Sequence, residues 1–184
     1  MGTNVIGHFK FLAGMIDLCK AAPKSRIVIV SSKAHDMTKT INFDDFNRKK
    51  SYRKWQVYSE TKLGNLLLVY KLNRLLEEKG VSNIIAVGCH PGYSNTNLQS
   101  HTVFKRLNYA FAQSAEMGAK PTVLAATGEN VKAGSYCGPS GLFELNGEPK
   151  VNCKLNKAVF NTKLQDELWA KCEELTSANL ADKL

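Results

Sequence analysis

Tyr58 and Lys62 stand four residues apart in a stretch of helical periodicity, which places both side chains on one face, one turn apart. An ammonium group close to a phenol favours the phenolate, so it lowers the tyrosine pKa from about 10 toward neutral pH. Such a tyrosine can exchange a proton with an alcohol or a carbonyl oxygen. The pair alone is a weak signal, because a lysine-rich chain with six tyrosines forms such pairs by chance.

Ser32 ends an apolar, β-branched run over residues 26–32, which predicts a parallel strand covered by helices on both faces. Open α/β sheets place their active sites at the carboxyl ends of strands. A hydroxyl at this position could therefore hold a substrate oxygen beside Tyr58. Ser31 is the alternative, since adjacent residues on a strand face opposite ways and only one serine can face the site.

A second buried strand is predicted over residues 83–89, and the turn His90-Pro91-Gly92 follows it. Pro91 and Gly92 fix a turn that lets the backbone approach a flat ligand closely. His90 is a candidate general base, but the weaker one, because Tyr58 fills that role and the sequence shows no acidic partner nearby.

The periodicity of the rest of the chain predicts an alternation of helices and strands. Apolar residues at helical spacing predict a first helix, ended by Pro23, and a long helix over about 56–79, ended by Gly80. This alternation predicts an α/β fold with about three strands of a parallel sheet and flanking helices, in a single domain over residues 1–184. Further expected elements are helices over 114–127 and 162–175, a third strand over 141–145, and a polar stretch over 33–54 that is either functional or carries short structure of its own.

Composition and charge exclude several classes of protein. The net charge is +9, but its basic stretch lacks any helix-turn-helix, zinc-finger or RNA-recognition pattern, so we expect a solvated loop and no nucleic-acid partner. No apolar run approaches the roughly 20 residues that cross a bilayer, so no transmembrane segment is expected in this chain. Five scattered cysteines without C-x-x-C spacing predict no metal site and favour the cytoplasm or another reducing compartment.

Four ordered segments resemble successive motifs of the short-chain dehydrogenases/reductases: residues 2–9 (GTNVIGHF), 27–35 (IVIVSSKAH), 58–65 (YSETKLGN) and 90–96 (HPGYSNT). The long interval between Ser32 and Tyr58 is similar to the retinol dehydrogenase-like and WW-domain-oxidoreductase-like branch. The segment 134–139 (GSYCGP) also resembles that branch. Four motifs in order are far more specific than one Tyr/Lys pair.

The resemblance implies a role for each catalytic residue. Tyr58 would be the acid/base, and Ser32 would orient the substrate oxygen. Lys62 would lower the tyrosine pKa and bind the nicotinamide ribose, and Asn4 would hold a water in the proton relay. Hydride would pass between NAD or NADP and a small lipophilic alcohol or carbonyl, such as a retinoid or a steroid.

The resemblance also implies a cofactor site, of which the sequence carries one part. Tyr58 and Lys62 would contact the nicotinamide half, and the turn from Pro91 and Gly92 to Thr96 would receive the carboxamide. The family's glycine-rich fingerprint, T-G-x-x-x-G-x-G, is absent from the sequence. The strand whose end selects NAD or NADP is missing with it, so the preference stays open.

These departures predict the C-terminal half of a doubly wound Rossmann-type domain. A fragment or partial gene product is the first interpretation and a natural short form the second, and membrane association of a longer parent stays open. The alternative function is an inactive interaction module. In the family, the first helix (about 2–19) and the Tyr58 helix commonly form a dimer interface, so a homodimer through these helices is expected.

Overall fold

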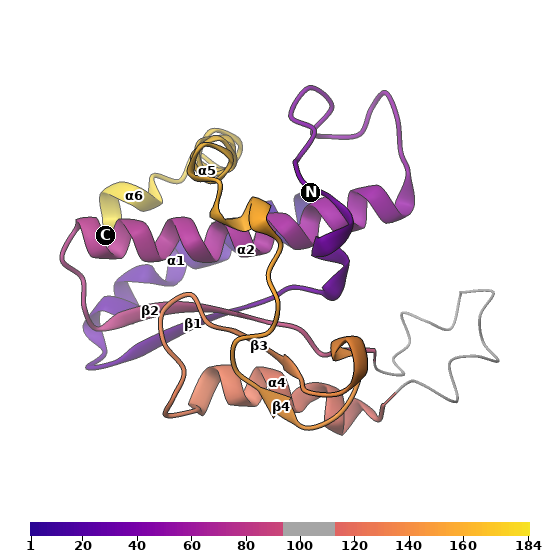
Figure 1. Cartoon of the computed structure of the whole chain (residues 1–184). Coiled ribbons are helices and arrows are strands. Elements are labelled where there is room, and N and C mark those ends of the chain that lie inside the picture. Colours follow the sequence, from indigo (N-terminus) through magenta and orange to yellow (C-terminus); the bar gives the residue numbers. More distant parts are fainter. Residues whose placement is uncertain (94–112) are drawn as a thin grey trace.

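The computed structural model describes residues 1–93 and 113–184, which fold as a sheet with helices on both faces (Figure 1). The sheet has four strands in the order β1-β2-β3-β4; the first three are parallel, and β4 is antiparallel to β3. The predicted α/β fold with a parallel sheet is therefore confirmed. The strands are β1 Ser25–Val30, β2 Ile84–Cys89, β3 Tyr136–Pro139 and β4 Pro149–Lys150.

β1 and β2 form the longest pairing of the sheet, in register from Ser25 opposite Ile84 to Val30 opposite Cys89. Nearly all of β2 is buried, as its apolar run predicts. β1 lies at one end of the strand order, and most of its residues are only partly buried; Val30 is 38% exposed. The prediction of a strand buried under helices on both faces is therefore right for β2 and wrong for β1. A terminal strand is more exposed because it has a neighbouring strand on one side only.

Three long helices cover one face of the sheet and build the main core (Figure 1). Their buried residues recur at helical spacing, as in the first helix, where Phe9, Ala13 and Ile16 are buried. The longest helix ends just before Gly80, whose φ of +70° suits a residue without a side chain. None of the helices in the described ranges is long and apolar enough to cross a membrane. The helices on this face are α1 Gly7–Ala21, α2 Lys54–Glu78 and α5 Thr162–Thr176, followed by the short α6 Leu180–Lys183.

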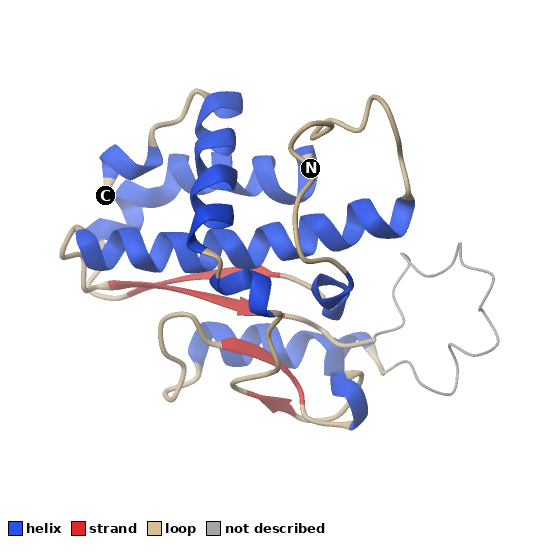
Figure 2. Ribbon diagram, turned by 45° about the horizontal axis from the view of Figure 1, so that its top comes forward, coloured by secondary structure: helices blue, strands red, loops and turns tan. Residues whose placement is uncertain are grey.

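The opposite face of the sheet is covered by α4 (Ala115–Thr127), as Figure 2 shows. Ser114 caps the start of this helix, because its hydroxyl accepts a hydrogen bond from the Met117 N–H at 3.2 Å. The predicted helices over 56–79, 114–127 and 162–175 agree with α2, α4 and α5 within two residues at each end. A second, smaller core lies on this side and consists of Val87, Cys89, Ala125, Val131 and Cys137.

The third strand is β3, so the prediction of a strand over 141–145 is wrong. Leu142–Glu144 instead form a short 3-10 turn, η4, in which Phe143 and Glu144 have left-handed φ values of 51° and 59°. Residues other than glycine rarely adopt these backbone angles, so the residue types Phe and Glu do not predict the turn. The true strand reads Tyr-Cys-Gly-Pro, and its glycine and proline are typical of turns.

The polar loop that follows β1 carries structure of its own, as the sequence predicts. It begins with a 3-10 turn, η2 (Lys33–Met37). Farther along, the Asp45 carboxylate accepts hydrogen bonds from the backbone N–H groups of residues 49–51. Arg48 pairs with the buried Glu60 of α2. The loop is therefore ordered by internal contacts, and most of its basic residues face solvent, as expected of a solvated loop.

Candidate active site

Tyr58 and Lys62 lie on one face of α2, as their spacing predicts. The Lys62 Nζ lies 5.6 Å from the centre of the Tyr58 ring and donates a hydrogen bond to the Val30 carbonyl at 3.2 Å. The Asn65 side chain donates to the same carbonyl at 3.0 Å. These contacts hold the Lys62 ammonium between the tyrosine ring and the carboxyl end of β1.

The charge and the donors of Lys62 suit it for binding hydroxyl groups. Burial lowers the pKa of the Lys62 ammonium, while the nearby Cys89 raises it by a smaller amount. An ammonium group carries three N–H donors and no acceptor. Among the described residues, the Val30 carbonyl accepts one of these donors. The others remain for a ligand such as a ribose.

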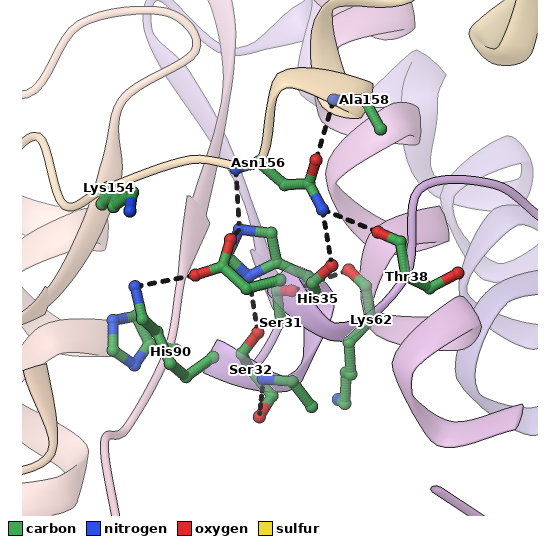
Figure 3. Close-up of polar contacts among 12 residues, drawn as sticks. Ser31, Ser32, His35, Thr38, Lys62, His90, Lys154, Asn156 and Ala158 are labelled. Carbon is green, nitrogen blue, oxygen red and sulfur yellow. Dashed lines mark hydrogen bonds and ion pairs between the residues drawn. The ribbon is translucent and has the colours of Figure 1, made fainter. Parts of the chain in front are cut away.

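The structure gives Ser31 and Ser32 different environments, and Figure 3 shows both beside Lys62. Ser31 is buried, and its hydroxyl donates to the Lys62 carbonyl at 2.7 Å, which ties the end of β1 to α2. Ser32 is only partly buried, and its hydroxyl accepts a hydrogen bond from the Ala34 N–H at 3.2 Å. A hydroxyl that accepts keeps its own proton for a ligand oxygen. This geometry favours Ser32 over Ser31 as the substrate-facing serine.

Asn4 lies in an unusual helical turn directly before α1. Gly2–Ile6 form a π-helical turn, η1, of a kind frequent at functional sites. The Asn4 amide donates to the Thr61 hydroxyl at 3.2 Å, and this hydroxyl donates to the Tyr58 carbonyl at 2.7 Å. Asn4 is therefore connected to the Tyr58 turn of α2 through Thr61, a residue to which the sequence pattern assigns no role.

The turn after β2 is as tight as its residues predict, but the close neighbour is the protein itself. Gly92 has a φ of +70°, and a Cβ there would lie 2.6 Å from Pro139 Cγ, so a larger residue does not fit. Pro91 precedes it and is partly buried. Thr96, the far end of the proposed carboxamide contact, lies outside the described residues.

His90 is poorly suited to act as a general base. It is fully buried, its Nδ1 accepts from the Gly92 N–H at 3.3 Å, and its ring lies 5.1 Å from the Tyr136 ring. Burial lowers the pKa of His90 to about 4. An acidic partner does exist, contrary to the expectation, because Glu144 Oε2 lies 3.9 Å from His90 Nε2. That residue comes from a distant part of the chain, where neighbouring sequence cannot reveal it.

Glu144 is a buried carboxylate whose charge is balanced by cations. It accepts a hydrogen bond from the Lys154 backbone N–H at 3.0 Å and pairs with Lys33 at 3.0 Å and Lys150 at 3.2 Å. Burial alone would raise the pKa of Glu144, but these donors hold it at about 2. The Cys153 thiol and the His90 imidazole each have a potential metal-ligand atom within 4.8 Å of the Glu144 carboxylate. Because two ammonium groups already bind the carboxylate, the arrangement favours an ion-pair network over a metal site.

The residues present fit one end of a dinucleotide cofactor. The Lys62 ammonium lies beside the Tyr58 ring, and its N–H groups are donors that hydroxyl groups, such as those of a ribose, can accept. The diphosphate of such a cofactor is bound in many folds by a glycine-rich turn that leads into a helix. The sequence contains no such fingerprint. If a dinucleotide binds, the groups identified in this chain would contact its nicotinamide end.

Comparison with known proteins shows that the chain is similar to dehydrogenases. No protein-family model matches it. Human retinol dehydrogenase 14 is 36% identical over 155 residues, which are 78% of this chain and 45% of that protein. The short-chain dehydrogenase TIC 32 B, chloroplastic, of Brassica napus is 34% identical over 179 residues, 91% of this chain and 53% of that protein. The chain thus spans about half the length of the curated relatives it matches.

A solved structure has the same fold. The crystal structure of an uncharacterized protein from Mycobacterium Paratuberculosis superimposes with a TM-score of 0.76 at 32% sequence identity. The match covers 97% of this chain and 59% of that one. The arrangement of strands and helices described above therefore recurs in a longer chain.

Proposed function

We propose that this chain, whose homologues are retinol dehydrogenases and other short-chain dehydrogenases, carries the catalytic residues of an NAD(P)-dependent oxidoreductase for a lipophilic alcohol or carbonyl. The homology supports the oxidoreductase class and the Rossmann-like fold. The observation that carries the proposal further is the position of the Lys62 ammonium. It lies against the Tyr58 ring and the Val30 carbonyl, at the strand end where Ser32 follows.

Each residue of the site has a separate role in the proposed proton transfer. NAD(P), when bound, supplies or accepts the hydride. In the reduction direction, the Tyr58 hydroxyl gives its proton to the substrate oxygen, and the Lys62 ammonium stabilises the phenolate that remains. The Ser32 O–H orients the same oxygen. Asn4, whose amide donates to the Thr61 hydroxyl of the same turn of α2, would hold a water that returns a proton to Tyr58.

Cofactor binding by the isolated chain is the decisive measurement. We expect NADPH or NADH to bind in a calorimetric titration, and retinal to be reduced in the presence of the cofactor that binds. The Tyr58→Phe variant should lose at least about a hundredfold in turnover, because it removes the acid/base, and should retain cofactor affinity. Tyr52→Phe is the matched control, since Tyr52 is exposed on the neighbouring loop and should behave as the wild type.

Two results would count against the proposal. Absence of binding for both cofactors would refute catalysis by this polypeptide alone. Retained turnover in Tyr58→Phe would refute the role of that residue while leaving the oxidoreductase class in place.

A second candidate function, a non-catalytic interaction module, is favoured by one observation. Phe11 and Leu18 on α1 are 71% and 64% exposed and, with Met15, form an apolar stripe at helical spacing. We expect a second copy or an intact homologue to cover this stripe. A dimer in sedimentation analysis that dissociates in the Phe11→Glu/Leu18→Glu variant supports this function, and a monomeric wild type that fails to pair with a full-length homologue excludes it.

A further inference from the structure

The turn that follows Ser32 is held by a residue far away along the chain. Asn156, which directly precedes the 3-10 turn η5 (Lys157–Phe160), contacts His35 of η2 across 121 residues of sequence (Figure 3). We infer that Asn156 is a positioning residue of the proposed active site, which fixes residues 32–38 and thereby the place of the Ser32 hydroxyl. The catalytic meaning of this inference rests on the proposed function, whereas its structural part can be tested separately.

The Asn156 side-chain amide closes the end of η2. Its Nδ2 donates hydrogen bonds to the carbonyl oxygens of His35, at 3.1 Å, and Thr38, at 2.6 Å. The last carbonyl groups of a helical turn have no partner within that turn. A single amide group therefore satisfies two carbonyls and fixes the separation between them.

The His35 ring extends this contact to the backbone of Ser32. Its Nδ1 lies 2.8 Å from the Ser32 carbonyl, and its Nε2 accepts from the Asn156 backbone N–H at 3.2 Å. The Asp36 carboxylate lies farther from Nε2, at 3.4 Å. Because a carbonyl only accepts and an N–H only donates, the ring is neutral and carries its proton on Nδ1. The ring is fully buried, and burial lowers the pKa of His35, which preserves this form.

The hydroxyl of Ser32 depends on the same turn. It accepts the hydrogen bond of the Ala34 N–H, so a displacement of η2 moves both the backbone and the side chain of Ser32. The ion pair between Lys33 and Glu144, at 3.0 Å, holds the turn independently. Loss of the Asn156 contact should therefore loosen the turn without unfolding it.

Asn161 provides a matched control for Asn156. Each asparagine caps the helical turn that follows it, through acceptance from the Ala158 N–H at 2.9 Å and from the Leu164 N–H at 3.1 Å. Serine retains a cap acceptor at either position. Both variants therefore keep a cap acceptor, but only Asn156→Ser also loses side-chain hydrogen bonds to His35 and Thr38.

The test combines amide hydrogen exchange with kinetics on the full 184-residue chain. In Asn156→Ser, the peptides that cover residues 31–41 should exchange about tenfold faster, because two hydrogen bonds to this turn are lost. Turnover of retinal, kcat, should fall about tenfold or more, because a small misplacement of a reacting group is costly, while the Kd for NADPH stays unchanged. Asn161→Ser should leave both quantities at the wild-type values.

The outcomes separate this inference from the proposed function. Unchanged exchange over 31–41 in Asn156→Ser overturns the inference whatever the turnover, and faster exchange with an unchanged kcat overturns its catalytic part. Absence of turnover in the wild type counts against the proposed function, and the exchange result then decides the structural part. If Asn156→Ser does not fold, His35→Asn serves instead, because it keeps a donor to Ser32 but loses the acceptor for the Asn156 N–H.

Discussion

Two neighbouring regions at the carboxyl edge of the sheet, which we call the open and the sealed region, both contain polar side chains but differ in how deeply these are buried. In the open region, the polar side chains are only partly buried, and within the described part of the chain the Lys62 ammonium donates to the Val30 carbonyl. In the sealed region, aromatic rings, a carboxylate and a thiol are buried against one another. The open region consists of Ser32, Tyr58 and Lys62; the sealed region consists of His90, Tyr136, Glu144 and Cys153.

The pKa values in the sealed region show what this difference means. Burial lowers the pKa of His90 to about 4 and raises that of Cys153 to about 12, and the cations around Glu144 hold its pKa at about 2. None of these groups changes its protonation near neutral pH. Burial of His90 and Cys153 and the ion pairs of Glu144 therefore keep the sealed region out of proton transfer near neutral pH and leave it a structural role.

The largest expected effect lies in the open region. Lys62→Met removes the ammonium beside the tyrosine, so turnover of retinal should fall by at least about a hundredfold. The free energy of unfolding, measured in urea, should change little, because a partly desolvated charge is removed together with its cost. Lys71→Met, on the same helix and paired with Asp166, is the control and should keep wild-type turnover. Equal losses in both variants would contradict a specific role for Lys62.

In the sealed region the expected effect is on stability. A Cβ added in Gly138→Ala would lie 2.5 Å from His90 Cδ2 and closer still to Nε2, and such overpacking should lower the free energy of unfolding by up to about 3 kcal/mol. Gly14→Ala is the control, because a Cβ there meets nothing within 4 Å; it should stabilise α1 by about 0.5–1 kcal/mol. Urea denaturation of the two variants measures both effects, and an unchanged Gly138→Ala would show that the region is loosely packed.

Replacement of Glu144, the carboxylate of the sealed region, should have a smaller effect on the free energy of unfolding. Glu144→Gln weakens the contacts with Lys33 and Lys150 and should lower the free energy of unfolding by about 1–2 kcal/mol at pH 7. The folded pKa of Glu144 lies below its unfolded value of 4.5, so its stabilisation is present above pH 4.5 and is lost as the pH falls toward 2. This part of the acid profile should disappear in the variant. Glu148→Gln, at an exposed ion pair with Lys120, should keep it.

The smallest effect concerns the buried imidazole. The folded pKa of His90, about 4, lies below its unfolded value of 6.5, so the unfolded chain binds the proton first as the pH falls. The free energy of unfolding should therefore decrease by about 1 kcal/mol from this group between pH 7 and 5.5. Urea titrations at the two pH values, with His90→Asn as the comparison, measure this contribution. If His90→Asn showed the same pH dependence of the free energy of unfolding as the wild type, a group other than His90 would be responsible for it.

The sequence predicts the elements in which side-chain periodicity is strong. The helices α1, α2, α4 and α5 and the strands β1 and β2 follow from apolar spacing. β3 escapes prediction because its four residues include Gly138 and Pro139, and η4 escapes because Phe143 and Glu144 adopt an unusual backbone conformation. Such conformations depend on contacts with other parts of the chain, which local propensity does not contain.

The same limit applies to the candidate site. The spacing of Tyr58 and Lys62 places them together without knowledge of the fold, because one helix carries both. The choice between Ser31 and Ser32 requires the strand's orientation, which only the structure supplies. The contact of Asn156 with His35 crosses 121 residues, and nothing in the spacing of either residue signals it.

The position of β1 at the end of the strand order also affects how the molecule behaves at high concentration. Among the described strands, β2 is the partner of one edge of β1, and the backbone groups of the other edge point away from the sheet. An edge of this kind is a template for another extended chain, and charge repulsion is one defence against such contacts. The net charge of +9 supplies that repulsion. We therefore expect the colloidal stability of this 184-residue chain to depend on ionic strength, since salt screens the charges over about 10 Å at 0.1 M and leaves the edge unchanged.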